Sequence, residues 1–390
     1  MIIKTIFWFF IFVLIYIYIG YPCLLFLISR IKKTHPLSRT KIYPKVSLII
    51  AAYNEENVIR KRIENILTLD YPKDNLEVII ASDGSTDKTN DIVLEYKKNG
   101  IILNLLPQRK GKMAALNETV KKANGDILIF SDADILFKND NIEKLVHSFV
   151  DPAVGCVSGI KKIIDIRSSA ESSENLYWKY EFFLKLLENK IGSLVSSVIG
   201  CNFAIRKNLY VPLEEKTTAE DLALPIICIS QGYKVVMEPH AISYEKLVPD
   251  FKTEFLRKIR IIKGGLHAIG SVKNKIKYLD KLSFFELFSH KVLRWYAPFF
   301  LIGTLLVNSL LQHGFYLLFL FFQIIFYFLS LIGWFIQDKN INFRVKILNK
   351  IFGIPFYFSA MNAASFIGIF EYIFKKHKGW VSWEKEMVVN

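Results

Sequence analysis

The sequence predicts a cytosolic α/β domain, built on a mostly parallel sheet with helices on both faces, that is flanked by transmembrane helices. Two observations lead to this fold class. Strand-like and helix-like patterns alternate between about residues 45 and 240, and this alternation is typical of a parallel sheet covered by helices. Long uncharged stretches lie on both sides of this region, and about 20 apolar residues are enough to span a bilayer.

The first uncharged stretch lies near the start of the chain, from Thr5 to Ser29. It is too long for the hydrophobic part of a signal peptide, and no small-residue cleavage site follows it. We therefore predict a retained transmembrane anchor over residues 1–33.

The central region shows the alternation directly. Short apolar runs rich in Val and Ile predict strands, and apolar residues at helical spacing predict the helices between them. Thr86 or Asp87 is a suitable N-cap for the second helix. The predicted strands cover residues 46–50, 78–80, 101–106 and 127–130, and the predicted helices cover residues 55–69, 87–98 and 113–123.

The second uncharged stretch covers residues 295–337 and is long enough for two spans, with a tight turn near Gln312-His313-Gly314. Residues 351–370 form a fourth candidate span. The expected organisation is therefore a central α/β region at 45–266, an interfacial linker at 267–294, a membrane region of two to three spans at 295–374 and a tail at 375–390.

The chain carries a net charge of +15 and has a pI of about 9.4. Basic residues flank the predicted spans, for example Arg30 and Lys32 after the first and Lys291 and Arg294 before the second. Lys and Arg mark the cytoplasmic ends of membrane spans, so the excess charge predicts a cytosolic central domain at a lipid surface and no nucleic-acid partner. The four cysteines show no paired spacing and are expected to be reduced.

The carboxyl-terminal segment gives conflicting signals. Four spans would place the basic residues 375–378 outside the cell, whereas the positive-inside rule places them inside. Either the last segment is re-entrant, or one of the candidate spans lies at the membrane interface.

The strongest chemical motif is Asp132-Ala133-Asp134, which closely follows the apolar run at residues 127–130. Open α/β sheets bind ligands at the carboxyl ends of their strands. Two carboxylates at this spacing can hold a hard cation such as Mg²⁺ or Mn²⁺, which commonly accompanies phosphate groups. A plain polar junction between strand and loop gives the same pattern, so the pair alone leaves both interpretations open.

Polar residues also follow the first two predicted strands. Tyr53 can offer a ring face to a base, and Asp83 can accept a hydrogen bond from a base or ribose; an ordinary turn with a helix cap is the alternative for Asp83. Neither G-x-G-x-x-G nor G-x-x-x-x-G-K-[ST] occurs at the required place, which argues against a dinucleotide dehydrogenase and a P-loop site.

Three further groups carry charge in suggestive places. The basic residues 109–112 precede a helix, where phosphate binds well, although a solvated basic loop is the simpler interpretation. Glu220 or Asp221 opens a helix and could serve as a general base. Arg257 and Arg260 can bind a diphosphate, or they can belong to an amphipathic helix on anionic lipid. Residues 171–190 predict an aromatic-rich amphipathic helix that touches the membrane interface, where Trp178 is well suited.

Taken in order, these residues resemble the membrane-integrated family 2 glycosyltransferases, the group that contains hyaluronan, cellulose and poly-N-acetylglucosamine synthases. The resemblance covers about residues 45–266 and implies a Rossmann-like domain of the GT-A type in a bacterial or archaeal cell membrane. It implies Asp134 as the direct metal ligand with Asp132 beside it, and Asp221 as the catalytic base. The other roles that it implies are a nucleotide pocket at Ala52, Tyr53, Asn54, Glu55 and Asp83, a diphosphate contact at Lys112, and an acceptor loop at 200–206 that includes Cys201, Asn202 and Arg206.

One departure from the family pattern bears on function. Processive synthases carry Q-x-x-R-W near the membrane, whereas this chain has Arg257-Lys258-Ile259-Arg260 followed by Ile261. We therefore expect inverting, Mg²⁺- or Mn²⁺-dependent transfer from a UDP-sugar to a lipid-linked or saccharide acceptor, with limited addition favoured over polymerisation. A processive synthase, a non-catalytic nucleotide-sugar-binding protein and a nucleotidyltransferase are the alternatives.

Overall fold

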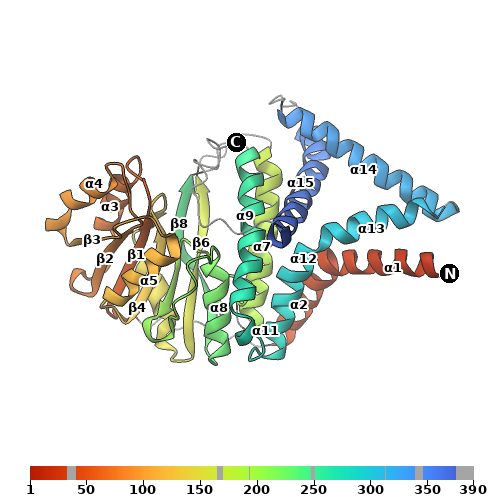
Figure 1. The fold of residues 1–390 in the computed structure, drawn as a ribbon. Coiled ribbons are helices and arrows are strands. Elements are labelled where there is room, and N and C mark those ends of the chain that lie inside the picture. The colour runs from red at the N-terminus through yellow and green to blue at the C-terminus, as the bar shows by residue number, and fades with distance from the viewer. Residues whose placement is uncertain are drawn as a thin grey trace.

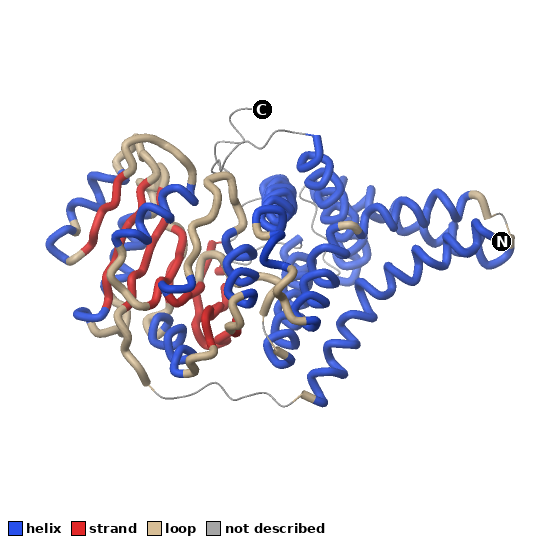
Figure 2. Tube along the Cα trace, turned by 60° about the horizontal axis from the view of Figure 1, so that its bottom comes forward, coloured by secondary structure: helices blue, strands red, loops and turns tan. Residues whose placement is uncertain are grey.

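The computed structural model describes residues 1–32, 41–164, 170–192, 194–246, 251–311, 313–338 and 346–374. The predicted tail at 375–390 and the basic residues 375–378 lie outside this part. A sheet domain forms one half of the molecule and a bundle of helices forms the other (Figures 1 and 2).

The sheet has eight strands in the order β3-β2-β1-β4-β7-β6-β8-β5. The first half, β3-β2-β1-β4, is parallel, as predicted. In the second half, β6 and β8 are also parallel, whereas β7 runs antiparallel to both β4 and β6, and β5 runs antiparallel to β8. The sheet is therefore mixed in this half. The strands are β1 Val46–Ala52, β2 Leu76–Ser82, β3 Ile101–Leu105, β4 Ile127–Asp132, β5 Leu136–Phe137, β6 Val154–Ile164, β7 Phe203–Arg206 and β8 Lys234–Lys246.

The parallel strands form because their residues are buried on both faces of the sheet. Alternate side chains point to opposite faces: Ile49 joins the core cluster under α5 and α8, whereas Leu48 and Ile50 join the cluster under α3 and α6. The helices of the sheet domain are α3 Ile59–Leu67, α4 Thr89–Glu95, α5 Lys112–Lys122, α6 Asn141–His147 and α8 Glu220–Ser230.

The first two helices begin later than predicted, and the cause is local. Asn54 has a φ of 56°, in the left-handed region, so the chain turns once more before α3 begins. Lys88 occupies the N-cap position of α4, one residue later than predicted, and the Asp87 carboxylate before it accepts hydrogen bonds from the peptide N–H and the hydroxyl of Thr89.

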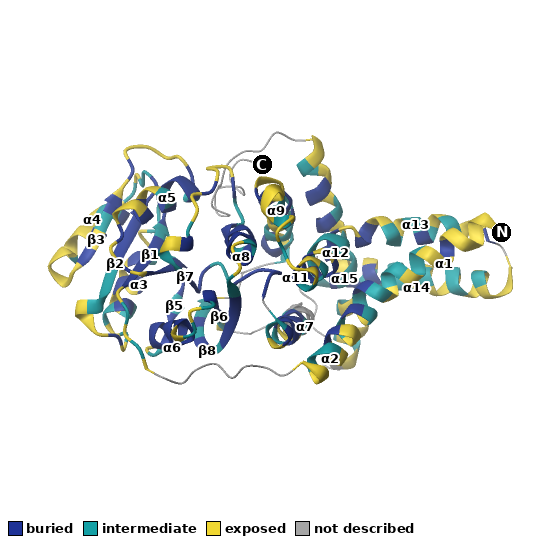
Figure 3. Ribbon diagram, turned by 90° about the horizontal axis from the view of Figure 1, so that it is seen from below, coloured by how far each residue is buried: buried dark blue, intermediate teal, exposed yellow. Residues whose placement is uncertain are grey.

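Two long helices separate the sheet from the membrane helices. These are α7 Ala170–Ile191 and α9 Phe251–Ser271, which stand side by side in Figure 1 and are seen almost end-on in Figure 3. In α7, Trp178 lies between Lys161 and Arg257, 5.1 Å and 5.8 Å from its ring centroid. Trp178 therefore contacts side chains of the protein, whereas Phe182 and Phe183 of the same helix are exposed.

Three helical segments are long and apolar enough to cross a membrane: residues 2–31, 314–337 and 347–374. A fourth candidate is bent by 53° between residues 281–295 and 297–309. The predicted second span is thus a short helix after a bend.

The remaining helices are α1 Ile2–Ile15, η1 Tyr16–Gly20, α2 Tyr21–Ile31, α10 Lys273–Ile276, α11 Lys281–Glu286, η6 Leu287–Val292, α12 Leu293–Trp295, α13 Ala297–Ser309, α14 Gly314–Asp338 and α15 Lys346–Phe374. Short 3₁₀ turns are η2 Lys73–Asn75, η3 Lys97–Asn99, η4 Ser148–Val150 and η5 Lys207–Leu209.

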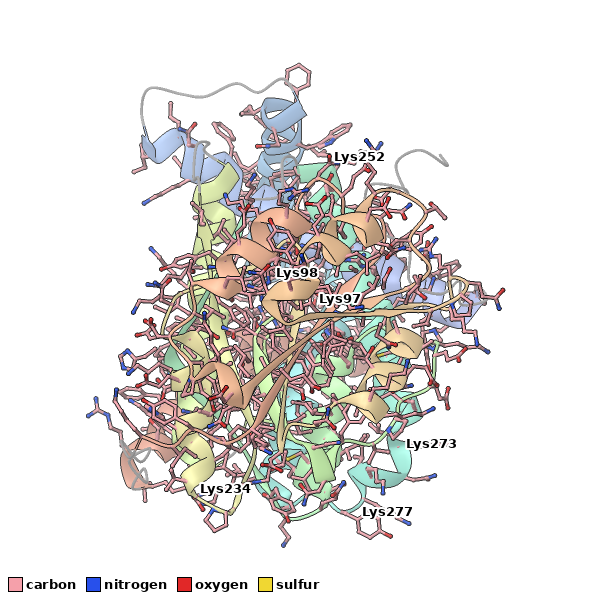
Figure 4. The ribbon with its side chains drawn as sticks, turned by 90° about the vertical axis from the view of Figure 1, so that its left-hand side faces the viewer. Lys97, Lys98, Lys234, Lys252, Lys273 and Lys277 are labelled. Carbon is pink, nitrogen blue, oxygen red and sulfur yellow. The ribbon has the colours of Figure 1, made fainter. Side chains whose placement is uncertain are left out.

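Lysines are spread over one side of the molecule, on the sheet domain and on the region of α9 and α10. Figure 4 labels lysines at separate places on one face: Lys97 and Lys98 near the centre, Lys252 toward the top, and Lys234, Lys273 and Lys277 toward the bottom.

Candidate functional site

The loops after β1 and β2 are joined to each other by side-chain hydrogen bonds. Asn54 accepts from the Thr86 N–H (2.8 Å), and its own N–H donates to the Ser85 hydroxyl (3.1 Å). The Glu55 N–H donates to the Thr89 hydroxyl at 2.7 Å. The predicted nucleotide residues 52–55 therefore form one wall with the loop that follows Asp83.

Asp83 is buried, and both of its oxygens are used inside the protein. Oδ1 accepts from the Lys110 N–H and Oδ2 from the Gly111 N–H, each at 2.8 Å. Burial raises the pKa of Asp83, although these two hydrogen bonds and Arg109 oppose the shift. Asp83 thus anchors the basic loop 109–112, and a direct contact with a base or ribose stays a prediction.

Two features bring the basic loop close to the first wall. Gly84 has a φ of +67°, and a Cβ there would lie 2.6 Å from the Arg109 nitrogen, so a glycine is required. The Arg109 guanidinium lies 4.1 Å from the ring centroid of Tyr53. One face of Tyr53 is therefore covered, and stacking on a base would use the other face.

Lys112 connects the two acidic motifs. Its Nζ lies 2.8 Å from Asp132 Oδ1 and 2.6 Å from Glu220 Oε1. Burial alone would lower the pKa of Lys112, but the two carboxylates raise it above its ordinary value. The ammonium has three donors, so one remains for a phosphate oxygen after both carboxylates are bound.

The Asp132-Ala133-Asp134 turn lies at the carboxyl end of β4, as predicted. Desolvation, followed by the charges of Asp132 and Glu245, raises the pKa of Asp134 to about 6. Since the Asp134 side chain remains exposed, water screens part of this effect. Two neighbouring carboxylates that destabilise each other's charge suit a divalent cation, and these two residues would hold it. In the described ranges, no group of three or more His, Cys, Asp or Glu residues gathers to hold a metal, so its other ligands would be phosphate and water.

Asp221 and Glu220 differ in their surroundings, although they are neighbours in sequence. Glu220 is buried and bound to Lys112. The Asp221 carboxyl lies against Gly200, where a Cβ would be 3.5 Å from its Cγ, and no ion pair or side-chain hydrogen bond holds it within the described residues. Burial, followed by the charge of Glu220, raises the pKa of Asp221 to about 6. The geometry therefore favours Asp221 over Glu220 as a proton acceptor.

The residues of the predicted acceptor loop, 200–206, lie in different surroundings. Cys201 is buried near the acidic turn, and burial raises the pKa of its thiol. Asn202 is buried and donates to the carbonyls of Ile160 and Ala241, both at 3.1 Å, so it ties β6 to β8.

Arg206 lies at the other end of the strand, paired in register with Ile127 at the start of β4. Its guanidinium binds the carbonyls of Phe149, Asp151 and Val154. β7 thus carries Arg206 about 16 Å along the sheet from Asp132, so Arg206 lies apart from the acidic turn, and a place beside an acceptor stays a prediction.

The helix that carries the basic cluster, α9, packs against the residues before α8. A Cβ at Gly264 would lie 2.3 Å from the Thr218 hydroxyl, which places α9 directly against the residues before Glu220. Arg260 and Arg257 are four and seven positions before Gly264 and share its face. In this conformation the Nε of Arg257 donates to Glu254 at 2.6 Å, and a contact with a diphosphate stays a prediction.

Sequence reasoning did not identify three features of the site. These are the Lys112–Glu220 ion pair, the Lys161–Glu245 ion pair near Asp134, and the buried Arg62 behind the acidic turn. The paired residues lie far apart in sequence. Arg62 lies in the apolar stripe of its helix, and a charged residue at such a position is the sequence feature that could have identified it.

Comparisons with known proteins agree with this geometry. The family model described as "Glycosyl transferase family 2" matches residues 47–211. A probable glycosyltransferase, YdaM of Bacillus subtilis, is 30% identical over 242 residues, which are 59% of this chain and 57% of that protein. Poly-beta-1,6-N-acetyl-D-glucosamine synthase of Staphylococcus aureus is 27% identical over 210 residues, which are 53% of this chain and 50% of that protein. The chain thus spans little more than half the length of these curated relatives.

A solved structure resembles the chain over nearly its full length. It is the mannosyltransferase PcManGT from Pyrobaculum calidifontis in complex with GDP-Man and Mn²⁺, with a TM-score of 0.73 and 20% identity over 96% of this chain and 99% of that one. This likeness confirms the predicted GT-A-like α/β fold with terminal apolar helices. The family match covers β1 to β7, so residues 47–211 form a family 2 glycosyltransferase domain.

Proposed function

We propose that this protein is an inverting, metal-dependent glycosyltransferase that moves a sugar from a UDP-sugar to a membrane-associated acceptor, either lipid-linked or saccharide. The observation that carries the proposal is the arrangement of Asp221. Its carboxylate lies beside Gly200 and has no ion pair or side-chain hydrogen bond among the described residues, and Glu220, its neighbour, is connected through Lys112 to Asp132. A base, a buried cation and the acidic turn therefore occupy one continuous site.

The reaction follows from these positions as a single displacement. The Asp221 carboxylate removes the proton from an acceptor hydroxyl, and the freed oxygen forms a bond to the anomeric carbon. The bond from that carbon to the diphosphate breaks, and the nucleoside diphosphate leaves with the electron pair. The configuration at the anomeric carbon is inverted because the attack occurs once, from the opposite face.

The leaving group gains negative charge, and the chain offers cations to stabilise it. Lys112 has a free donor, the loop 109–111 presents basic residues, and α9 adds Arg257 and Arg260 on the face toward α8. A bound Mg²⁺ or Mn²⁺ at Asp132 and Asp134 would supply Lewis-acid stabilisation of the diphosphate. PcManGT, which shares the fold, holds GDP-Man with Mn²⁺, which supports a nucleotide-sugar donor and makes a GDP-sugar the second donor class to test.

Identifying the leaving group tests the proposal against its alternatives. Membranes containing the protein are incubated with labelled UDP- and GDP-sugars, and the nucleotide products are separated by chromatography. We expect a nucleoside diphosphate to accumulate together with glycosylated product. Pyrophosphate would indicate a nucleotidyltransferase, and binding without any released nucleotide would indicate a non-catalytic nucleotide-sugar-binding protein.

A further inference from the structure

Arg62 is the least expected side chain of the domain. It lies on α3 in an apolar stripe and is 0% exposed. Within the described residues, no carboxylate lies within ion-pair distance of its guanidinium, and its Nε has no hydrogen-bond partner. A buried charge without an ion pair is costly, and a well-packed apolar side chain would be less so. Arg62 therefore needs an explanation other than packing.

The contacts of Arg62 lead to the acidic turn. Nη2 donates to the Ser131 hydroxyl at 2.9 Å, and Ser131 immediately precedes Asp132. The guanidinium carbon lies 4.3 Å from the ring centroid of Phe137, three residues after Asp134. Arg62 thus touches the chain on both sides of Asp132-Ala133-Asp134.

Asn65, one turn later on α3, completes the same arrangement. Its side-chain oxygen accepts from the Phe137 N–H at 2.8 Å, and its amide donates to the Phe137 carbonyl at 2.9 Å. The same oxygen also accepts from Arg62 Nη1 at 3.0 Å. Four hydrogen bonds therefore connect Arg62, Asn65, Ser131 and Phe137.

Arg62 also places a positive charge behind the two carboxylates of Asp132 and Asp134. Burial lowers the pKa of Arg62, and the groups that oppose this shift are Cys201, Asp134 and Asp132. A fixed cation behind the turn offsets the repulsion between the two carboxylates, and the hydrogen bonds hold the backbone that carries them.

We propose that Arg62 and Asn65 are positioning residues, which hold the Asp132-Ala133-Asp134 turn in the one conformation that receives a divalent cation. This inference rests on the proposed function, which places the cation at that turn. The groups behind metal ligands commonly change metal affinity by about 10–100-fold when they are removed. A guanidinium is suited to the task because its planar fork can bind two partners and stack on a ring, which an ammonium cannot do.

The test measures Mn²⁺ affinity by electron paramagnetic resonance on the full-length protein in the presence of UDP. Arg62→Met, Arg62→Lys and Asn65→Ala are compared with Arg60→Met, a matched control because Arg60 lies on the same helix, is exposed and pairs with Glu95. Thermal unfolding identifies variants that fold. We expect about 10-fold or greater weakening in each folded variant at 62 or 65 and a change of less than about twofold in Arg60→Met.

Hydrogen exchange provides a readout independent of the metal. The Phe137 N–H donates to Asn65, so its exchange should become faster in Asn65→Ala and stay unchanged in Arg60→Met. If Arg62→Met fails to fold, Arg62→Lys and Asn65→Ala carry the test. Folded variants at 62 and 65 with Mn²⁺ affinity within twofold of the wild type would overturn the inference.

A separate variant distinguishes failure of the inference from failure of the proposed function. Asp134→Ala should abolish Mn²⁺ binding. If it does not, the cation site is wrong and the positioning role falls with it. If Asp134 is required and Arg62 and Asn65 are not, only the positioning role is overturned.

Discussion

Asp221 is the residue on which the proposed chemistry depends most directly. Its carboxylate lies beside Gly200 with no side-chain partner among the described residues, whereas Glu220 is bound to Lys112. We expect Asp221→Asn to retain UDP affinity and to lose turnover by about 100-fold or more, because an amide cannot accept the acceptor's proton. Titration calorimetry and turnover assays on the same preparation measure the two quantities. Glu220→Gln is the comparison variant; turnover near normal in Asp221→Asn would move the base elsewhere.

The same carboxyl predicts a pH dependence. Burial and the Glu220 charge raise the pKa of Asp221 to about 6, and only the ionised form can act as a base. Activity should therefore be full above pH 7 and fall as the pH decreases through about 6, and kcat/KM against pH at saturating metal reports this limb. A flat profile between pH 5 and 8 would contradict a rate-limiting role for this carboxylate.

Several of the site residues could be predicted from sequence because they follow strands. The carboxyl ends of β1, β2 and β4 meet at one edge of the sheet, so Asn54, Asp83 and Asp132 are brought together by topology alone. Arg206 and Asn202 could not be placed in this way. The antiparallel direction of β7, which decides which end of the strand faces the site, has no local sequence signal.

At the scale of elements, α15 differs from the other candidate spans. Its mean hydropathy is 1.3, against 2.5 and 2.4 for the segments 2–31 and 314–337, and 39% of its most apolar window is buried inside the protein. It packs along α9 and α7, whereas α1, α13 and α14 extend away from the sheet domain (Figures 1 and 3). α15 also packs on α14. That one candidate span is interfacial stays a prediction, and we expect α15 to be that span.

Cysteine accessibility tests this assignment. We expect cysteines at Ile347 and Phe374 to react with a membrane-impermeant reagent from the same side as a cysteine at Lys97 in the sheet domain. A cysteine at His313, between α13 and α14, should react from the opposite side. Reaction of Ile347 and Phe374 from opposite sides would show that α15 crosses the bilayer. The native Cys23 is exposed and is replaced beforehand.

At the scale of the whole molecule, three polar residues within the membrane helices form hydrogen bonds to neighbouring helices, although Asn308 Oδ1 is buried without a hydrogen-bond partner among the described residues. Asn308 donates to Gln323 at 3.0 Å, and Asn362 accepts from the Tyr18 hydroxyl at 3.3 Å. Hydrogen bonds between membrane helices commonly use such side chains. These three residues are therefore accounted for without a polar channel for a growing polymer.

Product size tests the resulting expectation of limited addition. Purified protein in lipid vesicles, supplied with its donor, should yield short products that extract into organic solvent with the lipid. The Asp221→Asn variant in matched vesicles measures background. High-molecular-weight polysaccharide inside the vesicles, made by this chain alone, would instead indicate a processive synthase.

The close approach of Gly264 to Thr218 has a consequence for how this molecule is built. One helix, α9, packs on the membrane-side α15 along one part of its surface and on the start of α8, next to Glu220 and Asp221, along another. A soluble fragment that ended before Phe251 would lack this wall of the active site. We therefore expect that the sheet domain and the membrane helices cannot be exchanged separately, because α9 contacts both α15 and the residues that precede Glu220 and Asp221.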